Sequence, residues 1–119
     1  MMKRWLTLLA GCTCVLGVTS AEATGTGTGS ITNLTSFTFN GVEMFTLTMS
    51  SMSSPFAACA HSNRFIISAQ DPKFKTVLAM LLGAYYSGSS VIVYGGGTCN
   101  TYDGASEDIN GACVSTTSC

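Results

Sequence analysis

The chain has 119 residues, and its five Lys or Arg and six Asp or Glu side chains give it a net charge of −1. Nucleic-acid binding requires clustered basic side chains that neutralise phosphates, so this sparse set argues against nucleic acid and against anionic lipid surfaces as partners. The length allows one small domain after a leader is set aside.

Residues 1–23 have the pattern of a secretory signal peptide. A basic start precedes a mostly apolar run over residues 5–18 and the small-residue segment TSAEA. The Ala-x-Ala motif predicts cleavage after Ala23, with Ala21 as the second choice. The apolar run has about fourteen residues, fewer than the ~20 that a spanning helix needs, so we expect no transmembrane segment.

Lipidation at Cys12 is the alternative, because LAGC at residues 9–12 resembles a bacterial lipoprotein box. The apolar run before Cys12 is short, and Cys14 would then remain as an odd thiol in an oxidising compartment. We therefore favour the signal peptide and a secreted or periplasmic location.

A β-hairpin is predicted first within the domain. Apolar side chains alternate with Ser and Thr on both sides of Asn40 and Gly41. An Asn-Gly pair between two alternating runs is a strong hairpin signal, because both residues tolerate positive φ. We predict strands over residues 31–39 and 42–49.

Three further segments adjoin this hairpin. TGTGTGS at residues 24–30 predicts a flexible lead-in before a domain that spans residues 31–119. The Ser- and Pro-containing residues 50–55 predict a loop. The apolar run RFIISA predicts a third strand over residues 64–69.

A helix is predicted next. Asp71 has the position of an N-cap and Pro72 that of the first helical residue, and Gly88 is expected to end the helix in the left-handed conformation. Apolar side chains recur at spacings of three and four, and others widen this stripe, so we expect burial over much of the girth. The stripe consists of Phe74, Val77, Leu78, Leu81 and Tyr85, widened by Met80, Leu82 and Tyr86.

Strands over residues 91–94 and 107–115 complete the predicted order of three strands, one helix and two strands. This order is that of the OB-fold, a small, partly open barrel plugged by its helix. An open antiparallel sheet with the helix on one face is the alternative, and the order alone does not separate the two. We predict an all-β domain with one helix, in an OB-fold-like small barrel.

The cysteines after the leader predict disulfides. An even count in an exported domain of this size indicates two bridges, and three pairings are open. Zinc sites usually pair cysteines two to four residues apart, a spacing that does not occur here. We favour Cys59–Cys99 with Cys113–Cys119.

Residues for catalytic chemistry are sparse. His61 is the single histidine, and without an evident nucleophile it is interpreted as a solvent-facing loop residue. Asp103, Glu107 and Asp108 lack the regular alternation of a calcium loop and are interpreted as a solvated turn. The glycines at 95–97 follow a strand but precede no helix, so they predict a bend rather than a phosphate site. We predict no enzyme activity, no metal site and no cofactor.

Tyr85, Tyr86, Tyr94 and Tyr102 lie among Ser and Thr residues. Tyr offers apolar area and a polar tip, a combination that suits neutral glycans. Tyr85 and Tyr86 are expected to pack in the helix interface, whereas Tyr94, at a strand end, is the better surface candidate.

Three segments resemble a known family: the tail GACVSTTSC, the AAC before the third strand, and LLGAYYSGSSVIVY. Over residues 57–119 they are similar to the B subunit of subtilase cytotoxin and its pertussis-like relatives. The resemblance implies a bacterial, exported OB-fold subunit that forms a ring of five and binds sialylated glycans on host cells. It also implies a separate catalytic A subunit as partner.

The resemblance has a departure, because the strand after the helix ends in GGGTC rather than in a longer aromatic loop. Among the family's glycan-contacting positions, Ser30 and Tyr94 fall at corresponding places, and the resemblance implies that they bind ligand. The predicted function is a non-catalytic secreted subunit that recognises glycans, assembled as a homopentamer. The alternative is a periplasmic or outer-membrane accessory or inhibitor protein with no sugar site.

Overall fold

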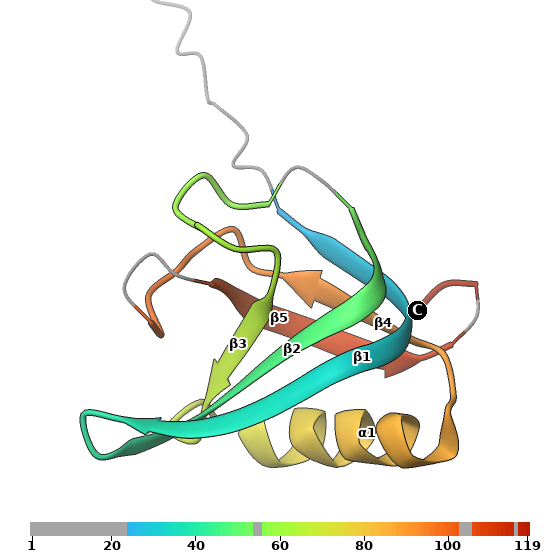
Figure 1. Cartoon of the computed structure of the whole chain (residues 1–119), viewed down its shortest axis with the longest axis horizontal. Coiled ribbons are helices and arrows are strands. Elements are labelled where there is room, and N and C mark those ends of the chain that lie inside the picture. Colours follow the sequence, from blue (N-terminus) through green and yellow to red (C-terminus); the bar gives the residue numbers. More distant parts are fainter. Residues whose placement is uncertain (1–23, 54–55, 103–105, 116) are drawn as a thin grey trace, which may run out of the picture.

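A computed structural model describes residues 24–53, 56–102, 106–115 and 117–119. The predicted signal peptide lies outside these residues, together with its cleavage sites at Ala21 and Ala23 and the lipidation site at Cys12. The described part of the chain forms a closed barrel of five strands with one helix across its end (Figure 1).

The first two strands form the predicted hairpin. β1 (Thr26–Phe39) pairs antiparallel with β2 (Val42–Ser53) over nearly the whole length of both. Asn40 and Gly41 between them have φ values of 49° and 76°, as the Asn-Gly turn predicts.

Both strands extend beyond their predicted limits, which corrects the flexible lead-in and part of the predicted loop at 50–55. Residues 26–30 belong to β1, where residues 26–29 pair with a second strand, and residues 50–53 belong to β2. Gly27 faces the barrel interior, and a Cβ there would collide with Met49 and Phe65. Gly27 therefore faces the interior between Thr26 and Thr28, in a paired and crowded strand rather than a flexible leader.

The remaining strands close the barrel. β3 (Phe65–Ser68) pairs antiparallel with β2 and parallel with β5 (Glu107–Val114). β4 (Val91–Gly95) lies between β5 and the first residues of β1. The resulting order, β1-β2-β3-β5-β4, returns to β1 and confirms the OB-fold-like small barrel.

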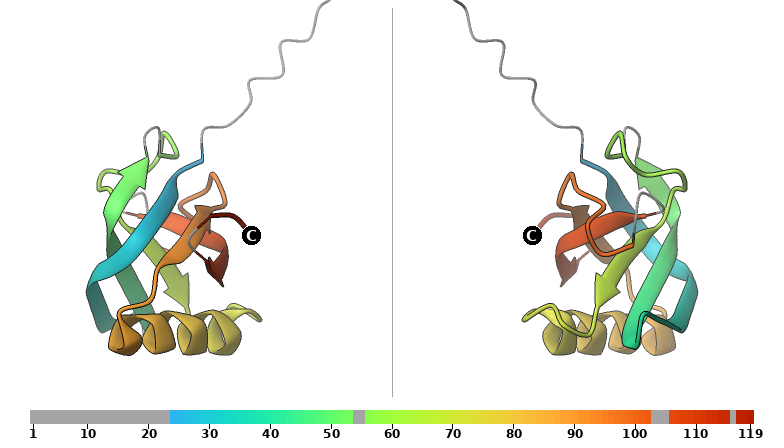
Figure 2. Two further views of the ribbon diagram at one scale, coloured as in Figure 1. Left: turned by 90° about the vertical axis from the view of Figure 1, so that its right-hand side faces the viewer. Right: turned by 90° about the vertical axis from the view of Figure 1, so that its left-hand side faces the viewer.

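The helix α1 (Phe74–Ser87) lies across one open end of the barrel, as the views in Figures 1 and 2 agree. It buries Val77, Leu81 and Ala84 against the barrel core. Gly88, with φ 70°, ends the helix in the predicted left-handed conformation. The core consists of Ile31, Leu47, Met49, Phe65, Ile67, Val77, Leu81, Ala84, Val91, Val93 and Ile109.

The start and the outer side of α1 differ from the prediction. Asp71 and Pro72 lie in a turn before the helix, because the Phe74 N–H bonds to the Asp71 carbonyl three residues back. Tyr85 and Tyr86 are 45% and 83% exposed and contact each other edge-on rather than packing into the interface. One end of a five-stranded barrel is narrow, so it buries a single stripe of the helix instead of most of its girth.

Both predicted disulfides, Cys59–Cys99 and Cys113–Cys119, are confirmed, each with Cα atoms 6.0 Å apart. Within the described residues no helix is both long and apolar enough to cross a membrane.

Candidate ligand-binding site

Tyr94 lies on the outer wall of the barrel. Val91 and Val93 on the same strand point into the core, so Tyr94 points to the opposite side, and it is 38% exposed. Its cross-strand neighbours are Thr26 on β1 and Gly111 on β5. The glycine leaves one side of the tyrosine ring uncrowded by a neighbouring side chain.

Hydroxyl side chains continue this row of residues. Thr26 is paired with Ser53, whose hydroxyl accepts from the Thr26 N–H at 3.1 Å and donates to the Thr26 carbonyl at 2.9 Å. The next outward row on the same strands carries Thr28 and Ser51, both exposed. We call Thr26, Thr28, Ser51, Ser53 and Tyr94 the tyrosine face; none of its side chains is charged at neutral pH.

Ser30 is also exposed but lies apart from Tyr94. It lies within the irregularity of β1 between Thr28 and Ile31, and its N–H bonds to the Ser50 hydroxyl at 3.1 Å. Ser30 is four positions along the strand from Thr26, the partner of Tyr94, which corresponds to about 13 Å. The structure therefore places the two predicted ligand-binding residues on one wall but does not bring them into contact.

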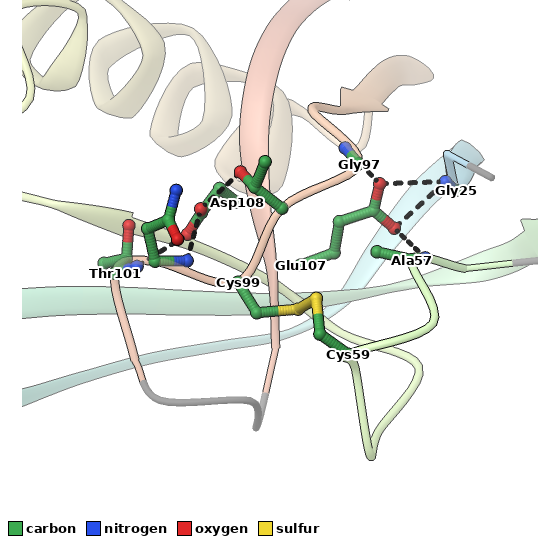
Figure 3. The surroundings of a disulfide bond; sticks show 10 residues. Gly25, Ala57, Cys59, Gly97, Cys99, Thr101, Glu107 and Asp108 are labelled. Atoms are coloured by element: carbon green, nitrogen blue, oxygen red, sulfur yellow. Dashed lines mark hydrogen bonds between the residues drawn. A yellow bond between two sulfur atoms is a disulfide. The ribbon is translucent and has the colours of Figure 1, made fainter. Parts of the chain in front are cut away.

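A buried carboxylate organises the opposite end of the barrel from α1. Glu107 has no exposed surface, and its carboxylate accepts hydrogen bonds from the backbone N–H groups of Gly25, Ala57 and Gly97 at 3.0–3.1 Å. These groups come from the start of β1, the segment before β3 and the loop after β4 (Figure 3). One side chain thus connects three segments that are distant in the sequence.

The backbone at the end of β4 passes close to the Glu107 carboxylate. A Cβ at Gly95 would collide with this carboxylate, and so the end of β4 requires glycine. The predicted bend follows at once, because Gly97 has φ 75°, a conformation that favours glycine.

Asp108 organises the loop that follows this bend. Its side chain accepts from the Thr98 hydroxyl and from the N–H groups of Asn100 and Thr101 at 2.7–3.0 Å. The Cys59–Cys99 bridge lies beside these bonds (Figure 3). Residues 98–101 are therefore held by a carboxylate and a disulfide together.

The interpretation of Glu107 and Asp108 as a solvated turn is wrong, because both are strand residues with satisfied carboxylates. Consecutive residues of a strand point to opposite sides, so the two carboxylates diverge and do not form a shared cation site. Asp103 lies outside the described residues. In the described ranges no group of three His, Cys, Asp or Glu side chains is placed to hold a metal ion.

The burial of Glu107 could have been predicted from its spacing to an apolar residue in the same strand. Glu107 and Ile109 are two residues apart in β5 and so share its inner face, where Ile109 is buried in the core. His61, in contrast, is exposed in the loop after Cys59, as predicted.

The loop held by Asp108 covers part of the outer face of β2 and β3. Ile66 and Thr46 are buried although they point away from the core, since their strand neighbours are the core residues. Tyr102 in turn packs edge-on against Phe37 and Phe39, with ring centroids 5.4 and 4.8 Å apart. In OB-folds this outer face is the usual binding surface for oligonucleotides and oligosaccharides, and here the protein's own loop covers part of it.

The fold and these surfaces define a small disulfide-bonded barrel with one helix, whose outer wall carries an uncharged tyrosine face. Comparison with protein-family models gives no matching family, and a search of curated proteins gives no matching sequence.

Proposed function

We propose that this chain is an exported, non-catalytic glycan-binding subunit, similar to the B subunits of bacterial toxins such as subtilase cytotoxin. The barrel order and the two disulfides are compatible with that resemblance. Disulfides persist in oxidising compartments, which supports a secreted or periplasmic location.

The observation that carries the proposal is the tyrosine face. A half-exposed tyrosine ring offers an apolar surface to sugar C–H groups, while flanking hydroxyls donate and accept hydrogen bonds without competing charge. These groups stand on paired strands, so their positions are fixed before a ligand arrives and little ordering entropy is lost on binding.

Replacing Tyr94 with Ala is expected to weaken glycan binding about tenfold, because the ring supplies the stacking surface. The measurement is binding of the refolded mature domain to an array of neutral and sialylated glycans, followed by titration of the best ligand. Tyr86→Ala is the matched control, since Tyr86 is exposed on α1, an element that contributes no residue to the tyrosine face.

Equal affinity of the Tyr94 and Tyr86 variants would contradict a role for the tyrosine face. Background signal of the unmodified domain for every glycan would contradict the proposed function and favour an accessory or inhibitor protein with no sugar site.

We further propose that the chain assembles as a ring of five that carries a catalytic A subunit, which the resemblance implies. Multivalency would raise the avidity of a weak single site by a factor on the order of a hundred or more. Sedimentation equilibrium of the mature domain is expected to give five times the monomer mass. A monomer at all concentrations would contradict the ring and leave the glycan site unaffected.

A further inference from the structure

A groove of about 320 Å³ lies on the wall formed by β2 and β3, away from the tyrosine face. In the strand order of the barrel, β2 and β3 are separated from β4 by β1 on one side and by β5 on the other. The groove is lined by Met44, Ser68, Gln70, Asp71, Asn100 and Thr101. Its size falls at the lower end of the range for small-ligand sites, about 300 Å³.

The groove is the part of the outer β2–β3 face that the loop after β4 leaves open. Met44 and Ser68 are cross-strand partners on that face, and Met44, 5% exposed, provides an apolar floor. Asn100 and Thr101 form one wall, and their backbone N–H groups are bound by Asp108. Because those backbone groups are already bound, the side chains of Asn100 and Thr101 are held beside the groove without using their own polar atoms.

The other wall carries Gln70 and Asp71 in the turn before α1. One Asp71 carboxylate oxygen, Oδ1, accepts from the Lys73 N–H at 2.8 Å, which fixes the side chain. Each carboxylate oxygen has two lone pairs, so acceptor capacity remains for a ligand.

The charge of the groove is negative. Among the lining residues that the structure describes, Asp71 is the charged one, and the nearby Lys73 ammonium bonds instead to the carbonyls of Ile109 and Asn110, at 3.5 and 3.0 Å. A carboxylate binds neighbouring hydroxyls by charge-assisted hydrogen bonds, and amides and hydroxyls complete such a set. The same carboxylate repels an anionic ligand.

We propose that this groove is a second saccharide site, selective for a neutral sugar with adjacent hydroxyl groups. Asp71 accepts from two adjacent hydroxyls, Asn100 and Gln70 hydrogen-bond the remaining polar groups, and Met44 contacts the C–H side of the ring. The site does not use Tyr94, so one monomer carries two separate saccharide sites, and the groove excludes the acidic sugars that the resemblance implies.

Residue-resolved NMR titration tests the groove separately from the tyrosine face. The ¹⁵N-labelled mature domain is titrated with methyl glycosides of galactose, glucose, mannose, fucose and N-acetylglucosamine, and with N-acetylneuraminic acid as the acidic probe. We expect at least one neutral glycoside to shift the amides of Ser68, Gln70, Asn100 and Thr101, with no such shift from the acidic sugar. Shifts confined to Thr26, Thr28 and Gly111 would support the tyrosine face and overturn the groove.

Two variants define the chemistry of the groove. Asn100→Ala removes the amide but keeps the backbone N–H that bonds to Asp108, and Asp71→Asn removes the charge but keeps an acceptor for the Lys73 N–H. Each is expected to weaken binding of the neutral glycoside about tenfold. This change corresponds to the loss of one charge-assisted hydrogen bond or of two neutral ones.

Asn63→Ala is the matched control, since Asn63 is exposed in the loop after the Cys59 bridge and does not line the groove. Unchanged affinity in both groove variants, or groove shifts by N-acetylneuraminic acid as large as those by the neutral sugars, would overturn the proposal. Absence of groove shifts with every neutral glycoside would overturn it as well.

Discussion

Replacing Glu107 with Gln is expected to lower the free energy of unfolding by about 3 kcal/mol, a large part of the stability of a domain of this size. The carboxylate accepts from three backbone N–H groups and is fully buried. The glutamine amide has one oxygen, which accepts, and one NH₂ group, which donates. The NH₂ group would therefore face at least one of the backbone N–H donors of Gly25, Ala57 and Gly97, where no hydrogen bond can form. The N–H groups that lose their partner remain buried, which is the costly outcome for a polar group.

Urea unfolding followed by circular dichroism measures this effect, with Glu43→Gln as the control. Glu43 is also a strand glutamate, but it is exposed and receives a single 3.4 Å bond from the Ser36 hydroxyl. Its variant is expected to change stability by less than about 0.5 kcal/mol. Similar losses in the two variants would show that the buried carboxylate contributes no more than a surface one.

Glu107 and Asp108 fix the segments that border the two candidate sites. Glu107 binds the start of β1, which continues into the tyrosine face, and Asp108 binds the wall of the groove. A site of neutral hydrogen bonds gains little energy from any one contact, so it depends on groups that are already in place. Glu107 and Asp108, adjacent on β5, hold such groups in place on opposite sides of the strand.

The elements with strong local signals were predictable from the sequence. The hairpin follows from Asn40-Gly41 between alternating runs, and the end of α1 follows from Gly88, since both need a backbone conformation that few residues adopt. The disulfide pairing was also predictable as the favoured one of three. The turn and helix-end signals depend on a few neighbouring residues and not on the rest of the fold.

The features that depend on tertiary packing were not predictable in the same way. Glycines of the TGTGTG segment suggest flexibility, yet Gly27 is required by the side chains of Met49 and Phe65 on other strands. Tyr86 belongs to an apolar pattern but lies outside the narrow stripe that the barrel end buries. The groove was missed for a related reason, because its two walls come from turns about thirty residues apart that the barrel brings together.

Removing the Cys59–Cys99 bridge is expected to destabilise the domain more than removing Cys113–Cys119. The two bridges span 40 and 6 residues of sequence, so the chain-entropy model gives about 4 kcal/mol for the first and roughly 2.4 for the second. The first bridge also holds the segment before β3 to the loop that covers the outer face of β2 and β3. The double variants Cys59→Ala/Cys99→Ala and Cys113→Ala/Cys119→Ala are compared by urea unfolding, and binding of the neutral glycoside is measured for both.

The two bridges serve as controls for each other, because each double variant removes two cysteines and one cross-link. Loss of the first bridge is expected to weaken groove binding as well as stability, since Cys99 immediately precedes Asn100 in the groove wall. The second bridge lies at the end of β5. Its loss is expected to lower stability while the groove affinity stays the same. An equal loss of stability in both variants would contradict loop entropy as the main contribution. Unchanged groove affinity without the first bridge would show that Asp108 alone holds the wall.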